Sequence, residues 1–208
     1  MQNKINYNLI LEETIASCQK QGIVPEVMLH SCCAPCSSYV LSLLGEYFRV
    51  RVFYYNPNIY PEEEYRMRAR EQERFIAKFP TRYPVDYVEG IYDTDRFYEM
   101  AKGLEDEPER GARCHKCYRL RLSETAKQAK RDGFDYFTTT LSISPQKDSA
   151  VLNEIGHEVS EEYGIPYLYS DFKKKDGYLK STKLSAEYGM YRQDYCGCVF
   201  SYNERSFR

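Results

Sequence analysis

The stretch VPEVMLHSCCAPCSSYVLSLL, residues 24–44, decides the fold of this chain. Residues 24–30 are short and apolar, which predicts a buried β-strand. A group of three cysteines follows, and Ser37 or Ser38 is then predicted to cap a helix that ends at Leu44. A strand that passes through a turn into a helix is the opening unit of an α/β fold.

The rest of the chain repeats this alternation of strands and helices. We expect further strands over 48–55, 85–89, 135–140 and 165–169, and helices over 7–21, 61–79, 93–103, 114–131, 145–163 and near 181–189. This order predicts a parallel sheet with helices on both faces, in a Rossmann-like arrangement. We predict a single α/β domain over 1–208, with the segment 170–208 packed on it. Ligands bind such sheets at the carboxyl ends of the strands, where the first cysteine group should lie.

Composition excludes several classes of protein. The 208 residues are 42% hydrophobic and 29% charged, which is typical of a globular domain, and the net charge of −2 argues against a strongly basic nucleic-acid binder. No apolar run approaches the ~18 residues that span a bilayer, and the first residues are too polar for a secretory signal. We therefore expect a cytoplasmic protein with no membrane partner. Thiols are reduced there, so grouped cysteines predict metal ligands or catalytic thiols.

Seven of the eight cysteines fall into three tight groups. These are Cys32, Cys33 and Cys36; Cys114 and Cys117; and Cys196 and Cys198. The second pair is spaced by three residues at a predicted helix start, so both sulfurs can reach one centre. With the adjacent first pair they supply four thiolates, which suit either a 4Fe-4S cluster or a tetrahedral zinc. The spacing Cys33-x-x-Cys36 would instead restore a usual zinc pattern, and ligand counting leaves both metals open.

The third group, Cys196-Gly-Cys198, has a different chemistry. A disulfide across one residue closes a small, strained ring that is easy to reduce, and Gly197 gives the backbone freedom to form it. The pair is predicted to act as a redox dithiol or as two ligands of a second metal.

Basic residues surround the second group and form a second run near the C-terminus. They are Arg110, Arg113, Lys116, Arg119 and Arg121, and the run from Lys173 to Lys183. A solvated surface is the ordinary interpretation of such runs. The alternative is a rim that contacts the phosphates of a folded RNA.

Five motifs in order resemble those of the epoxyqueuosine reductases of the QueH family. They are LHSCCAPCSS (29–38), FYYNPNIYPEEEYRMR (53–68), RCHKCYRLRL (113–122), FTTTLSISPQKD (137–148) and YCGC (195–198). The resemblance covers about residues 28–203. It implies the last step of queuosine formation, in which the epoxide of epoxyqueuosine at the wobble position of tRNA is reduced to an alkene without cobalamin.

The resemblance also implies a cofactor and its ligands. It assigns a 4Fe-4S cluster to Cys32, Cys33, Cys114 and Cys117, and the redox-active, catalytic pair to Cys196 and Cys198. The fold it implies is related to the PP-loop, or HUP-type, tRNA-modifying enzymes. Those enzymes have a glycine-rich pyrophosphate loop after the first strand, and residues 30–38 contain no glycine. An ATP site at this loop is therefore not expected.

Epoxide reduction needs two electrons, two protons and a group that binds the departing oxygen. A dithiol stores two electrons and an iron–sulfur cluster transfers one, so both together would link the two kinds of step. A second iron ion, held by Cys36, Asp194, Cys196 and Cys198, would be the Lewis acid. Tyr191, Arg192 and Tyr195 are the candidate general acids. The physiological electron donor is not indicated by the sequence.

Two other functions compete with this prediction. One is a PP-loop tRNA sulfur transferase, which would require ATP. The other is a non-catalytic, zinc-binding RNA adaptor. The iron and zinc contents of anaerobically purified protein separate them from the reductase.

Overall fold

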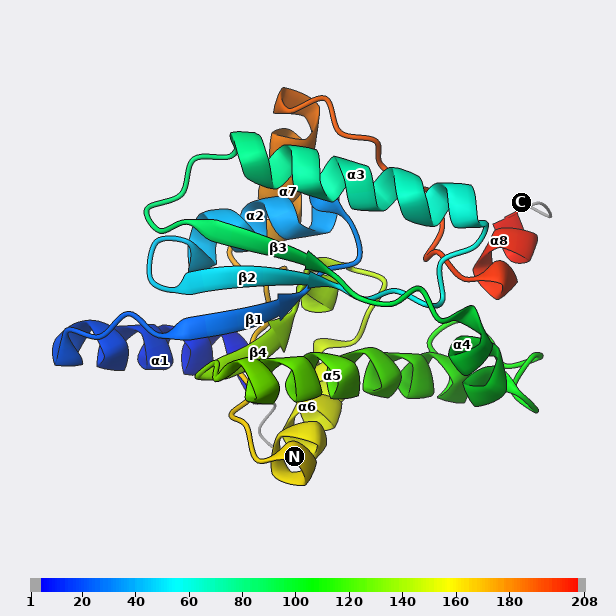
Figure 1. Ribbon diagram of the computed structural model, residues 1–208, viewed down its shortest axis with the longest axis horizontal. Coiled ribbons are helices and arrows are strands. Elements are labelled where there is room, and N and C mark those ends of the chain that lie inside the picture. The colour runs from blue at the N-terminus through cyan, green and yellow to red at the C-terminus, as the bar shows by residue number, and fades with distance from the viewer. Residues whose placement is uncertain (1–4, 206–208) are drawn as a thin grey trace.

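Four parallel strands form the centre of the molecule in a computed structural model that describes residues 5–205 (Figure 1). They are β1 (Glu26–His30), β2 (Arg49–Tyr54), β3 (Val85–Glu89) and β4 (Tyr136–Thr139), in the order β3-β2-β1-β4. β1 lies inside the sheet and pairs in parallel with β2 and β4. This order is that of doubly wound sheets, and the predicted α/β fold is confirmed. The PP-loop/HUP-type relationship stays a prediction.

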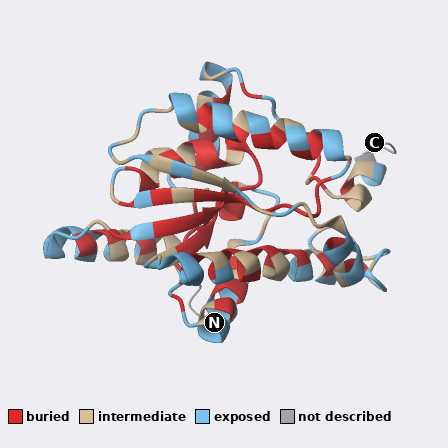
Figure 2. Ribbon diagram, in the orientation of Figure 1, coloured by how far each residue is buried: buried red, intermediate tan, exposed pale blue. Residues whose placement is uncertain are grey.

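Side chains of β1 alternate between two hydrophobic cores, one on each face of the sheet. Val27 and Leu29 pack with buried residues of α1 (Tyr7–Gln21), α2 (Ala34–Leu44) and α3 (Glu62–Lys78). Met28 packs on the opposite face with α5 (Ala112–Asp132) and α6 (Ser149–Tyr163). α7 (Gly177–Glu187) packs against α2. Burial is concentrated on the strands and the inner sides of the helices (Figure 2).

The remaining elements gather at the carboxyl edge of the sheet. One is α4 (Thr94–Ala101), which was predicted over 93–103. The other two, the 3-10 helix η1 (Thr140–Ile143) and α8 (Val199–Arg205), were not predicted. Figure 1 shows α8 and α4 beyond the arrowheads of the strands. Among the described residues, none of the helices has the length and apolarity that crossing a bilayer would require. The ends of the predicted 1–208 domain, 1–4 and 206–208, lie outside the described residues.

The start of α2 differs from the prediction. The helix begins at Ala34, not at Ser37 or Ser38, because Pro35 suits the first turn and Cys33 occupies the N-cap. The Ser37 hydroxyl instead donates to Gln72 Oε1 at 2.9 Å. Cys36 therefore lies in the first turn of a helix.

Three other predicted boundaries were wrong. The segment 165–169 forms a single parallel bridge, between Tyr167 and Phe137, because Pro166 has no N–H to extend the ladder. The helix predicted from position 145 begins at Ser149, where the Asp148 side chain accepts a bond from the Ala150 N–H at 2.8 Å. The helix predicted near 181–189 spans 177–187.

His30, the last residue of β1, is hydrogen bonded to β4 and to the residue after β2, next to the first cysteine group. Its ring nitrogens lie 2.9 Å from Thr139 Oγ1 and 3.2 Å from the Tyr55 carbonyl oxygen, and its side chain is fully buried. Burial, and secondarily the nearby Arg121 guanidinium, lower the pKa of His30 to about 3. The imidazole is therefore neutral in the folded protein at any ordinary pH.

Replacing His30 by alanine should destabilise the metal-free protein by about 2–4 kcal/mol, because two buried hydrogen bonds are lost and a cavity forms. The same change at exposed His157 should cost about 0.5 kcal/mol. The unfolded chain protonates this imidazole near pH 6.5 and the folded chain only near pH 3. The wild type should therefore lose up to about 1.4 kcal/mol more per pH unit below 6.5 than His30→Ala does. Urea unfolding at several pH values measures both effects, and equal costs for the two alanine variants would contradict the assignment.

Candidate metal and redox site

Helices α2 and α5 both begin at the carboxyl edge of the sheet, and both have cysteines at their N-terminal ends. The turn after β1 places Cys32 and Cys33 before α2, and Cys114 and Cys117 lie in the first two turns of α5. Helix N-termini carry a partial positive charge, which favours thiolate over thiol. The predicted location of the first cysteine group is confirmed.

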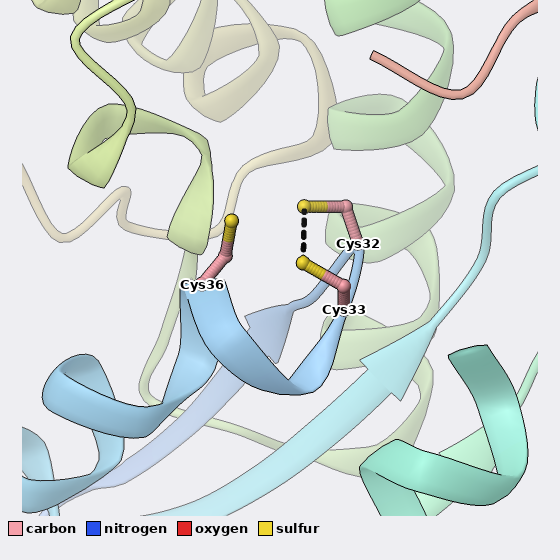
Figure 3. A group of neighbouring side chains, drawn as sticks. All are labelled: Cys32, Cys33 and Cys36. Atoms are coloured by element: carbon pink, nitrogen blue, oxygen red, sulfur yellow. Dashed lines mark hydrogen bonds between the residues drawn. The ribbon is translucent and has the colours of Figure 1, made fainter. Parts of the chain in front are cut away.

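Cys32, Cys33 and Cys36 form one compact group. The Sγ atoms of Cys32 and Cys33 are 3.8 Å apart, and all three sulfurs lie within 4.8 Å of one another. Figure 3 shows the first two sulfurs side by side, with Cys36 extending from the first turn of α2 toward the same space. Among the described residues, this is the one set of three or more Cys, His, Asp or Glu ligand atoms so close together. The group is compact enough to bind a single metal ion.

The pKa values of the three thiols shift in opposite directions. Hydrogen bonds from Cys33 and Cys36 hold the pKa of Cys32 well below its usual value. Burial, and then the Cys32 sulfur, raise the pKa of Cys33 to about 12, while Cys32 and Cys33 raise the pKa of Cys36. The hydrogen bonds within the group therefore favour a thiolate on Cys32 over one on Cys33 or Cys36.

Cys114 and Cys117, the second group, lie on α5 and are close to the third group. The backbone N–H of Arg110 donates to Cys114 Sγ at 3.3 Å. Burial above all raises the pKa of the Cys117 thiol to about 12; Arg121 opposes this rise, and the sulfurs of Cys196 and Cys198 contribute to it. The structure therefore brings the Cys-Gly-Cys pair next to the pair on α5.

Gly197 sets the course of the chain between its two cysteines. Its φ is +125°, and a Cβ there would lie 3.2 Å from both Arg68 Nη1 and Ile59 Cγ1. Its carbonyl accepts a hydrogen bond from the Tyr60 N–H at 2.7 Å. Only glycine combines this backbone conformation with so close an approach. All eight cysteines lie in the described part of the chain, and all are free thiols, so no disulfide joins Cys196 and Cys198.

A cavity of about 290 Å³ opens between the first and third groups. Its sulfur-bearing walls are Cys32, Cys36 and Cys196. Its other polar and charged walls include Glu109, Arg121, Ser144, Gln146, Lys147, Ser181, Arg192, Gln193, Asp194, Ser201 and Glu204. A mixed polar cavity of this size suits a small, hydrogen-bonding substrate group.

Buried cations face the sulfurs and suit an anionic metal centre. Arg121 and Arg68 are 2% and 0% exposed, and Arg121 Nη2 and Arg68 Nη1 have no hydrogen-bond acceptor among the described residues. Burial would lower the pKa of Lys147, but Cys196, Tyr118 and Cys32 raise it by more. Orphaned guanidinium nitrogens are costly unless negative charge lies nearby. Thiolates bound to a metal supply such charge, so the residues present fit a cysteine-ligated metal or cluster.

The structure brings together some members of each predicted set of metal ligands. Cys36, Asp194 and Cys196 line the same cavity, whereas Cys198 lies behind it, hydrogen bonded to Ser201 at 3.4 Å. The predicted cluster set combines the Cys32–Cys33 turn with the pair on α5. Arg121 lies near both the turn and the pair on α5, because Cys32 and Cys117 both raise its pKa against the effect of burial. The division of the seven thiols between a cluster and a second metal stays a prediction.

Two of the three candidate general acids line the cavity. Arg192 does so while Nη1 donates to Ser185 Oγ at 3.0 Å. Tyr195 does so as well, but its hydroxyl donates to the Tyr60 carbonyl at 2.5 Å. Tyr191 is not among the residues that line this cavity, and its backbone N–H donates to Glu71 Oε1 at 2.8 Å.

Several basic residues near the cysteines are used inside the fold. Arg113 is buried and donates to two carbonyl oxygens, while Arg119 pairs with Glu158 and Glu162, each at 2.6 Å. Lys173 Nζ lies 3.1 Å from Asp171 and donates to the carbonyls of Ser142 and Lys147. The contacts of Arg113 and Lys173 favour a structural role over contact with RNA phosphates, whereas the ion pairs of Arg119 lie on the surface.

Sequence reasoning missed the buried residues around the sulfurs. Arg121 follows Cys117 by one helical turn, so its position was detectable from the spacing in 113–122. Arg68 and Lys147 lie within quoted motifs but had no local signal of burial. Gln193, whose Nε2 is 2.8 Å from Cys33 Sγ, had no sequence signal at all.

Known proteins resemble this chain over most of its length. The family model described as "Epoxyqueuosine reductase QueH" matches residues 27–204. Relatives named epoxyqueuosine reductase QueH occur in Staphylococcus epidermidis (44% identical, covering 95% of this chain and 85% of the relative), Streptococcus pyogenes (40%, 95% and 78%) and Thermotoga maritima (38%, 86% and 91%).

In the reduced, metal-free protein, Cys32 should become alkylated at lower pH than Cys36, because its pKa is lowered while that of Cys36 is raised. Iodoacetamide labelling followed by peptide mass mapping between pH 6 and 9 measures both rates. The Cys32 rate should reach its plateau first, although Cys32 is only 8% exposed. A Cys36 plateau at the lower pH would show that the charge is assigned to the wrong sulfur.

Proposed function

Because the chain belongs to the epoxyqueuosine reductase QueH family, we propose that it reduces the epoxide of epoxyqueuosine to the alkene of queuosine at the wobble position of tRNA. The observation that best supports this is the cavity lined by cysteines of the first and third groups and by the buried Arg121, with the third group close enough to Cys117 to raise its pKa. Such a site combines thiol chemistry with stabilisation of negative charge, and both are needed to reduce a carbon–oxygen bond.

We propose that Cys32, Cys33, Cys114 and Cys117 hold a 4Fe-4S cluster. When bound, the cluster would supply electrons one at a time. The four thiols come from the starts of two helices; Cys32, Cys33 and Cys117 are buried, and Cys114 is half-buried. The buried guanidinium group of Arg121 would offset the negative charge of the thiolates, and so would that of Arg68, part of whose charge is balanced by Glu64 at 2.7 Å.

The third group has two proposed roles that compete. As a dithiol, Cys196 and Cys198 would store two electrons; as ligands, they would join Cys36 and Asp194 around a second iron ion. Both cysteines are free thiols, which each role requires of the reduced protein. Cys196 lines the cavity while Cys198 does not, so Cys196 is the one placed to approach a substrate.

The chain's own side chains prepare the cavity for a departing oxygen. Lys147 and Arg121 line it and keep their positive charge because the surrounding sulfurs raise their pKa against the effect of burial. A developing alkoxide would be stabilised by such fixed cations. Lys173 holds the Lys147 main chain in place through its carbonyl oxygen.

One observation favours a second candidate function. Cys32, Cys33 and Cys36 are close enough for a single zinc ion, as in a zinc-binding RNA adaptor. Anaerobic purification separates the two: about four irons and four sulfides per chain support the reductase, and one zinc with no iron supports the adaptor. Cobalamin independence, a cytoplasmic location and an electron donor of unknown identity remain proposals.

Exposed tyrosines beside the third group provide a surface on which tRNA bases can stack. Tyr60 and Tyr98 are 41% and 44% exposed, and Tyr98 is close enough to Tyr60 and Cys198 for both, after burial, to raise its pKa. Aromatic rings stack on unpaired bases, such as those of an anticodon loop.

Cys114→Ala should abolish cluster binding, since a four-cysteine site loses one ligand. Cys196→Ser should keep the iron and sulfide content of the wild type but lose turnover of epoxyqueuosine-containing tRNA. Iron and sulfide analysis, with a single-turnover assay on that tRNA, measures both. Normal turnover by Cys196→Ser would refute a redox or metal-binding role for this pair.

Tyr98→Ala should weaken binding of the substrate anticodon stem-loop by about 1–3 kcal/mol, the usual contribution of one stacked base. Tyr83→Ala is the matched control, because Tyr83 precedes β3 at the opposite edge of the sheet. Fluorescence anisotropy with a labelled stem-loop measures the affinities. Equal affinities for both variants and the wild type would remove Tyr98 from the proposed surface.

A further inference from the structure

Gln193 makes a side-chain hydrogen bond that joins the C-terminal segment to the first cysteine group. Its Nε2 lies 2.8 Å from Cys33 Sγ, across 160 positions of sequence. The oxygen of the same amide is buried and has no hydrogen-bond partner in the described part of the chain. Gln193 also lines the cavity, and Cys33 is fully buried beneath it.

The backbone on both sides of Gln193 is anchored. Before it, the Tyr191 N–H donates to Glu71 Oε1 at 2.8 Å and Arg192 donates to Ser185 Oγ at 3.0 Å. After it, the Tyr195 hydroxyl donates to the Tyr60 carbonyl at 2.5 Å. The amide is therefore held against the sulfur by a fixed segment, at the expense of leaving its oxygen unpaired.

We infer that Gln193 is a positioning residue for the redox centre: its N–H bond to Cys33 fixes this side chain and raises the reduction potential of the centre that Cys33 ligates. This inference rests on the proposed iron–sulfur chemistry. The reduced form of a cluster is more negative than the oxidised form, so a hydrogen bond donated to a ligand sulfur stabilises the reduced form more. Because Gln193 precedes Cys196 by three residues, it also ties the position of the Cys-Gly-Cys pair to Cys33.

Reconstituted protein tests the electronic effect. Gln193→Leu removes the donor, and Gln193→Glu replaces it by a negative acceptor of the same shape. Gln146→Leu is the control, since Gln146 lines the same cavity but its amide oxygen accepts a bond from Arg110. A redox titration followed by EPR should show the reduced form disfavoured about tenfold in Gln193→Leu, about 59 mV for a one-electron couple, and further in Gln193→Glu. An unchanged potential in Gln193→Leu with full iron content would overturn the inference.

Metal-free protein tests the contact without any cluster. Iodoacetamide should label Cys33 several-fold more slowly in Gln193→Leu than in the wild type or Gln146→Leu, because leucine still covers the sulfur but no longer donates the hydrogen bond that favours its thiolate. Cys18, which is 5% exposed and lies in α1, should stay protected in all three if the fold is intact. Equal Cys33 rates would overturn the contact, and this arm also decides the matter if a Gln193 variant fails to bind iron. A wild type that binds no cluster would refute the proposed function but leave the labelling result valid.

Discussion

Crowded sulfur atoms at the carboxyl edge of a parallel sheet are the constraint on which this structure depends. Cys32, Cys36 and Cys196 line one cavity there, and the sulfurs of Cys196 and Cys198 raise the pKa of Cys117. Each thiolate raises the cost of forming the next, as the opposite pKa shifts of Cys32 and Cys36 show. Nearby positive charge lowers the cost of forming these thiolates. Arg68 and Arg121 provide it from within the fold, and both keep unpaired nitrogens near the sulfurs.

The sheet makes this meeting possible. In a parallel sheet all strands end at the same edge and the following helices begin there, so the N-termini of α2 and α5 both point their partial positive charge toward it. The order β3-β2-β1-β4 puts β1 inside the sheet, which buries the turn that contains Cys32 and Cys33. The C-terminal segment then closes over this edge through Gly197, Tyr195 and Gln193.

The two cysteine pairs at helix starts differ in how they are controlled. Cys33 and Cys117 are buried thiols whose pKa is raised to about 12, so they favour the neutral form unless a metal or a donor such as Gln193 stabilises the charge. The pKa of Cys32 is instead lowered by the hydrogen bonds from Cys33 and Cys36. The metal-free site is thus poised to lose several protons together when a cation binds, which couples metal binding to pH.

The sequence by itself determined the fold class, the three cysteine groups and the family, because hydrophobic periodicity and cysteine spacing are local properties. It located α1, α3 and β3 to within a residue or two, but placed the N-cap of α2 four or five residues late and took 165–169 for a strand. The convergence of the third group on the second, the burial of Arg68 and Arg121 and the contact from Gln193 to Cys33 were decided by tertiary structure alone. These contacts join residues far apart in the chain, and their energies come from burial and electrostatics in space, which no local pattern records.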